Sequence, residues 1–269
     1  MILHRILSVL LMIGAALALE LLFGRRRSPR PRRSRWPANL GLGCLARLGT
    51  GNLILWVHAI SAGWGYRVGR GFFDRLGWDL LVKYAAFLLV VDFAQYWGHR
   101  LQHSVPLLWR IHAIHHTDLE VDATTTARVH PLQALVNIAT ATVALMLGLG
   151  GIVLGFRTLK QAFSVASHTN VRVPALLDRV LRWFIVTPSY HLVHHSAIGT
   201  EMNSNYCSVF TFWDRLFGTY TELSRLPVGP GAFGLAERRD PMRLGFWRLM
   251  LLPFRPDFPS PDPAAAPAR

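Results

Sequence analysis

Long apolar segments dominate the first two thirds of the chain. Residues 2–23, 40–63 and 76–98 are each long enough to cross a bilayer as a helix, which takes about 20 residues. A fourth block, 132–168, is too long for one span and too short for two upright ones, and "GLGG" at 148–151 permits a reversal within it. The pattern predicts an all-α fold with three membrane spans followed by a helical hairpin.

The overall composition supports a membrane protein. Hydrophobic residues make up 51% of the chain and charged residues only 16%. A soluble domain usually carries about 25% charged residues. The deficit follows from the long apolar segments, so we expect an integral membrane protein.

The positive charge is concentrated in one short run and predicts the topology. The formal net charge is +14, and much of it lies in "GRRRSPRPRRSR" at 24–35, directly after the first apolar segment. Such a run favours the cytoplasmic side and attracts anionic lipid, whereas no motif indicates binding to nucleic acid. Counting spans from this loop puts residues 99–131 and everything after 168 in a cytoplasmic cap. The arginine bias favours a bacterial inner membrane, or the endoplasmic reticulum if the source is eukaryotic.

The chain is expected to form one catalytic unit with flanking segments. We predict N-terminal spans with the basic loop at 1–75, the catalytic domain at 76–222 and a C-terminal segment at 223–269, whose Pro- and Ala-rich tail is predicted to be disordered. The two cysteines, Cys44 and Cys207, lie in an apolar and a polar segment, so no disulfide is expected.

Eight of the twelve histidines fall in three short clusters with helical spacing. They are "HRLQH" at 99–103, "HAIHH" at 112–116 and "HLVHH" at 191–195. Spacings of three and four put side chains on one helix face. Neutral imidazole binds iron, zinc and copper, and eight ligands suit two metals better than one. The eight candidate ligands are His99, His103, His112, His115, His116, His191, His194 and His195.

Two polar residues precede the first cluster on the same predicted helix face. Asp92 and Tyr96 are separated from each other and from His99 by steps of four and three. A carboxylate in a membrane span is a candidate functional group. Asp92 is expected either to accept an N–H from a ligand histidine or to pair with an arginine. Tyr96 is either a functional residue or a tyrosine of the membrane interface.

Four motifs together resemble one family. "DFAQYWGHRLQH", "LWRIHAIHH", "PSYHLVHH" and "NYCSVFTFWDRLFGTY" look like the fatty acid hydroxylase/sterol desaturase superfamily, nearer its sterol desaturase and alkylglycerol monooxygenase branch, over about residues 82–221. The resemblance implies a membrane enzyme with two iron ions, for which zinc can substitute. Such an enzyme uses O2 as co-substrate to hydroxylate or desaturate a lipid.

The resemblance also extends the list of site residues. It makes the eight clustered histidines metal ligands, adds His168 of "SHTN" as a further ligand, and suggests His130 of "RVHP" as a ligand or an outer partner. It implies that Asn205 either braces the last cluster or takes part in catalysis, and the same holds for Trp213 and Asp214. Cys207 stands where many relatives have glycine, whereas His4 and His58 match nothing and are expected to be structural.

The expected partners are a membrane lipid and a separate electron donor. The lipid is sterol-like, a fatty acyl chain or an ether lipid. The chain has no dinucleotide fingerprint, too few cysteines for an iron–sulfur cluster and no haem motif like that of cytochrome b5, so a ferredoxin, cytochrome or reductase must supply electrons. The alternatives are a histidine-rich metal transporter, a haem-binding electron carrier or a non-catalytic lipid-binding relative. The sequence gives no oligomeric state.

Overall fold

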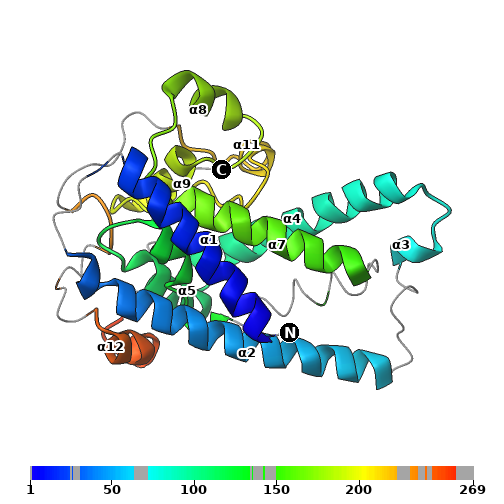
Figure 1. The fold of residues 1–269 in the computed structure, drawn as a ribbon, viewed down its shortest axis with the longest axis horizontal. Coiled ribbons are helices and arrows are strands. Elements are labelled where there is room, and N and C mark those ends of the chain that lie inside the picture. Colours follow the sequence, from blue (N-terminus) through cyan, green and yellow to red (C-terminus); the bar gives the residue numbers. More distant parts are fainter. Residues whose placement is uncertain are drawn as a thin grey trace.

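The chain folds almost entirely into helices in a computed structural model (Figure 1). The structure describes residues 2–24, 26, 31–63, 72–133, 135, 142, 150–222, 231–235, 240 and 244–258. Within these ranges the backbone forms no strand, and isolated bridges such as Gly24–Val171 join neighbouring loops. The predicted all-α class is confirmed.

Four long helices give the molecule its shape. They are α1 (Ile2–Phe23), α2 (Trp36–Gly63), α4 (Leu80–Ser104) and α7 (Gly150–His168). α1 packs on both α2 and α7.

The other elements are short helices and single turns. They are η1 (Arg32–Ser34), α3 (Phe72–Arg75), α5 (Pro106–His116), η2 (Ala123–Ala127), α8 (Ala175–Leu181), α9 (Pro188–His194), α10 (Gly199–Met202), α11 (Phe212–Leu216), α12 (Phe246–Leu251) and η4 (Leu252–Phe254). In Figure 1, α2, α4 and α7 extend towards one end of the molecule, where α3 also lies, whereas α5, α8, α9, α11 and α12 lie towards the other end.

Two helices have the length and apolarity needed to cross a membrane. Among the described residues they are the segment Ile6–Phe23 of α1 and the whole of Leu80–Ser104. Only 17% and 22% of these segments are buried, so their apolar side chains point outward, unlike those of a core helix in a soluble protein. They coincide with the first and third predicted spans, and α2 contains the second.

The expected hairpin is described only in part. Its second arm forms α7, whereas most of the first arm and the "GLGG" turn lie outside the described residues. The number of spans and the hairpin therefore remain predictions.

A proline fixes the bend that brings the first two histidine clusters together. α4 begins at the Asp79 cap, whose side chain accepts a hydrogen bond from the Leu81 N–H at 2.8 Å. It ends at Val105, which is extended (φ −93°, ψ 118°) because it precedes Pro106. Pro106 then starts α5, which packs back against α4.

The main apolar core joins α2, α5 and α12. Leu42, Ile114 and Leu249 are completely buried within it. α2 also packs closely on η2, because a Cβ at Gly43 would lie only 2.7 Å from the Cβ of Ala127. The glycine therefore permits a helix–loop contact that any side chain would disturb.

The C-terminal helix α12 is predicted to contribute directly to stability. Leu249→Ala removes a completely buried side chain and should lower the free energy of unfolding by about 2–5 kcal/mol. Leu251→Ala, on the same helix at 64% exposure, is the matched control and should change it little. Thermal unfolding of the two purified variants in detergent measures the difference, and equal melting temperatures would contradict the packing of α12 on α2.

Candidate metal centre

Nine histidines converge into two adjacent groups. Within each group, one ring nitrogen from every histidine lies within 4.8 Å of the others. The five-histidine group consists of His99, His103, His112, His116 and His194. The four-histidine group consists of His115, His168, His191 and His195. The structure therefore brings together all eight clustered histidines and His168.

The ends of four helices supply these side chains. α4 carries His99 and His103 in its last two turns, and α5 carries its three histidines in its last two turns. His168 is the final residue of α7. α9 starts at Pro188, with the Thr187 hydroxyl accepting from the Tyr190 N–H, and supplies the third cluster. Rings from the two groups are neighbours, since the His116 and His195 centroids lie 4.8 Å apart.

Backbone carbonyls set the tautomer of several rings. A carbonyl can only accept, so a ring nitrogen facing one must carry the proton. The Nδ1–H of His99 donates to the Tyr206 carbonyl and that of His194 to the Ser204 carbonyl, each at 2.8 Å. In both rings Nε2 is left with a lone pair that points into the five-histidine group.

The same reasoning applies to the four-histidine group. The Nδ1–H of His115 donates to the Arg128 carbonyl, and that of His168 donates to the Ser164 carbonyl. Their two Nε2 lone pairs therefore face each other at only 3.0 Å. A cation between them would turn this repulsion into two bonds.

The separations fit a shared metal ion. Nε2 of His168 lies 3.1 Å from Nε2 of both His191 and His195. Nitrogens bound at about 2.0–2.1 Å to one tetrahedral ion lie roughly 3.3 Å from one another. The four-histidine group is therefore already close to the geometry of a ligand set.

Several ring nitrogens have no partner within the described protein. They are buried and include Nε2 of His103, Nε2 of His194, Nδ1 of His191 and both nitrogens of His116. A buried polar atom without a hydrogen bond costs about 1–3 kcal/mol. So many unpartnered nitrogens in one place fit two metal ions, each of which would bind the one lone-pair nitrogen of a neutral ring and leave the other nitrogen as N–H.

The rings are also held in the form that binds metal. Burial, reinforced by the neighbouring imidazoles, lowers the pKa of His112, His116 and His195 well below the usual value of 6.5. The same causes lower the pKa of His191 and His194. These imidazoles are therefore neutral near pH 7, as metal ligands must be.

One short segment, residues 203–206, orients three rings of the five-histidine group. Besides the Ser204 and Tyr206 carbonyls, it offers the side-chain oxygen of Asn203, which accepts from Nδ1 of His103 at 3.2 Å. Asn205 lies between the two carbonyls with a φ of +54°, a left-handed conformation that asparagine tolerates better than most residues. Its side chain donates to the Tyr190 and Thr221 carbonyls, so it fixes the turn.

A buried carboxylate holds that segment in position. The oxygens of Asp214 accept from the backbone N–H groups of Tyr206 and Cys207, each at 2.9 Å. They also accept from the hydroxyls of Thr219 and Tyr190. Burial raises the pKa of Asp214 above its usual value, and these hydrogen bonds partly offset that effect. Asp214 thus acts on the histidines only through the backbone that they contact.

The structure gives Asp92 a partner that the sequence analysis did not anticipate. Its Oδ2 accepts from the Phe210 N–H at 3.2 Å and from the Trp213 indole N–H at 3.0 Å. It therefore ties α4 to the start of α11. It neither orients a histidine nor forms an ion pair with an arginine among the hydrogen bonds and ion pairs of the described residues.

Tyr96 and Asn205 likewise support the site instead of pointing into it. The Tyr96 hydroxyl bonds to the Thr219 hydroxyl at 2.8 Å, and its ring stacks on Phe217. The side chain of Asn205 is occupied by backbone groups. The bracing interpretation of Asn205, Trp213 and Asp214 agrees with these contacts.

His130 belongs to neither group. One of its ring nitrogens bonds to the Met250 carbonyl at 3.1 Å, and the other accepts from the Leu132 N–H at 3.2 Å. This arrangement leaves it without a free nitrogen for a metal. Its position supports a structural role between the loop after η2 and α12.

Several residues that orient the rings were not identified from the sequence. Ser204, Tyr206 and Arg128 act through backbone carbonyls, for which no side-chain pattern exists. Arg35 was interpreted as part of a basic run that sets the topology and attracts anionic lipid, and the structure shows it buried and paired with Asp118 at 2.8 Å. The two acidic residues at 118 and 122, just after the second cluster, are the signal that pointed to such a pairing.

The support of the five-histidine group can be tested through Asp214. In Asp214→Asn one acceptor oxygen becomes a donor, so segment 203–206 should loosen. Replacing a residue that orients a metal ligand through hydrogen bonds commonly lowers the metal affinity about 10–100-fold. We expect that loss at one of two metals, measured by competition with a chelator. Glu222→Gln, at an exposed position, is the control, and unchanged affinity in Asp214→Asn would contradict this support.

Comparison with known proteins agrees with the geometry. The fatty acid hydroxylase family model matches residues 84–219, which contain all nine histidines of the two groups. The chain is 31% identical over 147 residues to the ornithine lipid hydroxylase OlsE of Rhizobium tropici. Over 149 residues it is 32% identical to the alkylglycerol monooxygenase of Homo sapiens and to a cholesterol 25-hydroxylase-like protein of Danio rerio.

These similarities cover only part of each protein. They span 53%, 54% and 54% of this chain and 43%, 32% and 56% of the respective relatives. No protein of solved structure matches the chain. The family match, in contrast, covers half of the chain and both histidine groups. The resemblance inferred from the motifs is confirmed, and the chain belongs to the fatty acid hydroxylase family.

Proposed function

We propose that this protein is a membrane-bound di-iron oxygenase that uses O2 and external electrons to hydroxylate or desaturate a lipid. The observation that carries the proposal is the convergence of nine imidazoles, seven of them buried and two half-buried, into two adjacent groups of five and four. Family membership and relatives named as lipid hydroxylases and monooxygenases support the same reaction class.

The donor set supports two metal ions held only by histidine. The five-histidine group would hold one ion and the four-histidine group the other. Iron and zinc both accept imidazole, so zinc can replace iron when the protein is overproduced. Bound iron supplies the activation of O2 for attack on an unactivated lipid C–H bond, chemistry that no amino-acid side chain provides. The surrounding residues orient the rings and exclude water from them.

The arrangement favours an enzyme over a transporter. A transporter that passes ions along histidines would distribute them at several depths, whereas these nine side chains collect at one place. A haem carrier that uses two axial histidines would leave seven of them without a role. The compact double group is what a two-metal oxidation site requires.

We propose the substrate and the electron donor by chemical class only. The relatives are named for an ornithine lipid, alkylglycerol and cholesterol, so we propose a membrane lipid that is sterol-like, acyl or ether-linked. Electrons would come from a separate ferredoxin, cytochrome or reductase. We propose residues 76–222 as the catalytic unit and a cytoplasmic active site, in a bacterial inner membrane or, in a eukaryote, the endoplasmic reticulum.

The outward face of α8 supports a cap that rests against the bilayer. Leu176, Leu177 and Val180 are 73%, 49% and 51% exposed, whereas Asp178 is buried and accepts a hydrogen bond from Ser189. The helix thus turns its carboxylate inward and its apolar side chains outward. Trp183 and Phe184 extend the same exposed surface. A helix that exposes apolar side chains and buries its carboxylate is stable when its exposed face contacts lipid instead of water.

Metal content provides the first test. The wild-type protein should carry two metal ions per protomer, with iron preferred under reducing conditions. His115→Ala should reduce this number to one and abolish conversion of the lipid. His130→Ala removes a histidine that lies outside both groups and should leave two ions. Elemental analysis measures the metal content, and lipid profiling of cells with and without the gene measures the conversion. One ion or none in active wild-type protein would contradict the two-metal proposal.

The orientation of the cap provides a second test. A nitroxide label at Leu177→Cys, in a Cys44→Ser background, should collide with O2 dissolved in lipid more than with a water-soluble nickel chelate. Leu81→Cys on α4 gives the lipid reference, and Asp257→Cys, in an exposed ion pair, gives the aqueous reference. An aqueous signal at 177 would show that α8 does not contact the bilayer.

A further inference from the structure

The two histidine groups differ in what supports the loops around them. Four polar residues of the N-terminal arm, defined here as the described part of residues 2–39, bind the loops next to the four-histidine group. They are Glu20, Arg26, Arg35 and Asn39. All four lie outside residues 84–219, the region that matches the family.

Asn39 of α2 makes the most direct connection, to Arg128, Asp118 and Thr124. Its Oδ1 accepts from the guanidinium of Arg128 at 2.8 Å, and its Nδ2 donates to Asp118 and Thr124, each at 3.0 Å. Arg128 is the residue whose carbonyl accepts from Nδ1 of His115. The completely buried Asn39 amide therefore fixes the side chain of Arg128. The Arg128 carbonyl in turn orients the ring of His115 in the four-histidine group.

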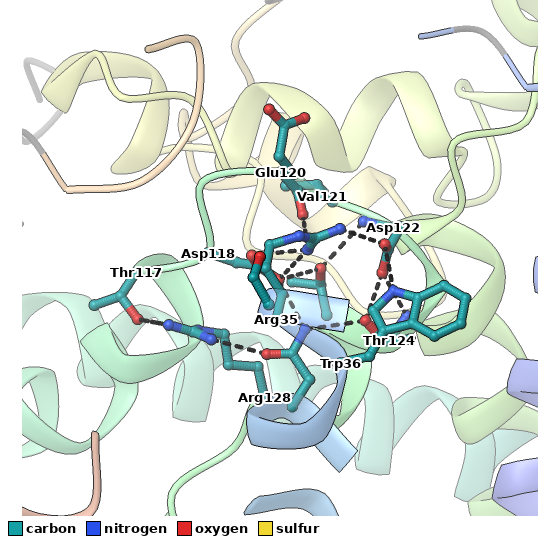
Figure 2. Close-up of polar contacts among 12 residues, drawn as sticks. Arg35, Trp36, Thr117, Asp118, Glu120, Val121, Asp122, Thr124 and Arg128 are labelled. Atoms are coloured by element: carbon teal, nitrogen blue, oxygen red, sulfur yellow. Dashed lines mark hydrogen bonds and ion pairs between the residues drawn. The ribbon is translucent and has the colours of Figure 1, made fainter. Parts of the chain in front are cut away.

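Arg128 transmits this contact to α5 as well. Its Nε donates to the Ile114 carbonyl at 3.1 Å and its Nη2 to the Thr117 hydroxyl at 2.8 Å (Figure 2). These partners lie on either side of His115 and His116 in the sequence. A fully buried guanidinium without the Asn39 oxygen would lose one of its acceptors, which is costly for a charged group.

Arg35 holds the other end of the same loop. Its guanidinium binds Asp118 at 2.8 and 3.0 Å, and also Asp122 and the Glu120 carbonyl (Figure 2). Asp122 in turn caps η2 by accepting from the Thr124 N–H. Residues 118–124 are thereby fastened to the start of α2.

Glu20 of α1 binds two segments next to the four-histidine group, at Ala123 and at Asn170. It lies within the apolar helix α1, is 4% exposed, and accepts from the Ala123 N–H and the Asn170 N–H, each at 2.9 Å. Asn170 follows His168 by two residues and also binds Arg26 through its side chain. Hydrogen bonds from these two backbone N–H groups offset the cost of burying a carboxylate within an apolar helix.

The segment that orients rings of the five-histidine group, residues 203–206, has no hydrogen bond to the arm among the described contacts; the arm reaches that group only through the hold of Arg128 on the end of α5. This segment hydrogen-bonds through its N–H groups and amide side chain to residues 190, 199, 201, 214, 219 and 221. All of these lie at residue 190 or later, from the start of α9 onward. The backbone that orients rings of the two groups is thus supported from different parts of the chain.

We propose that the N-terminal arm is a clamp that positions the four-histidine group selectively, with Asn39 and Glu20 as its positioning residues. The clamp holds residues 118–128 and 169–170, and through them His115 and His168. The proposal rests on the two-metal site proposed above. It predicts that damage to the clamp empties one metal site and spares the other, although no clamp residue touches a metal ligand.

Metal retention tests this independently of turnover. Asn39→Ala and Glu20→Ala should each weaken binding of one of two metal ions by about 10–100-fold, measured by dialysis against a graded chelator. Glu20→Gln keeps an acceptor oxygen and should restore most of the affinity. Ser34→Ala is the matched control in the arm, because its hydroxyl bonds only within its own exposed turn.

Double variants identify the site that is lost. His115→Ala combined with Asn39→Ala should still retain the one ion held by His115→Ala alone, because both changes act on the same group. His99→Ala combined with Asn39→Ala should retain none under the same chelator. The Glu20 variants give the same comparison if Asn39→Ala does not fold.

The outcomes separate the two proposals. Fewer than two ions in the wild-type protein would refute the two-metal proposal. Two ions in the wild type together with two firmly held ions in both Asn39→Ala and Glu20→Ala would refute the clamp. Equal weakening of both ions, or loss from the five-histidine group, would also overturn it, since either result would mean that the arm stabilises the fold without selectivity.

Discussion

The direction of the histidine protons is the constraint on which the centre depends. A buried imidazole whose Nδ1 faces a carbonyl must keep its proton there, and its Nε2 lone pair then points the other way. His99, His115 and His194 all obey this rule, each with a different carbonyl. The protein therefore gathers ring nitrogens whose lone pairs face one another, which is unfavourable unless cations lie between them. Helix ends, bends and loops all serve to hold that arrangement.

Buried polar groups carry out most of this work in an otherwise apolar protein. Glu20, Asp92 and Asp214 lie in or beside apolar helices, and each accepts hydrogen bonds from N–H or O–H donors of other segments. Because an unsatisfied buried polar group costs several kilocalories per mole, each carboxylate specifies which loop must pack against its helix. The same groups that would weaken a simple apolar core thus determine where the loops lie.

The two groups of histidines illustrate two ways of building a site. The segment after the third cluster orients rings of the five-histidine group through the Ser204 and Tyr206 carbonyls, on either side of a left-handed asparagine, all within the family region. The loops beside the four-histidine group are fastened to α1 and α2, which lie outside it.

The sequence by itself determined the helical class, the membrane-length segments and the metal-binding character, because apolar length and helical spacing are local properties. It also singled out His168, through the resemblance of its motif. Only the tertiary structure decided how the nine histidines divide into groups of five and four, since that depends on the bend at Pro106 and on helix packing. It also decided that both ring nitrogens of His130 bind backbone, that Asp92 holds Trp213, and that Arg35 is buried. These outcomes depend on backbone carbonyls and partners more than 80 residues away, which no local pattern encodes.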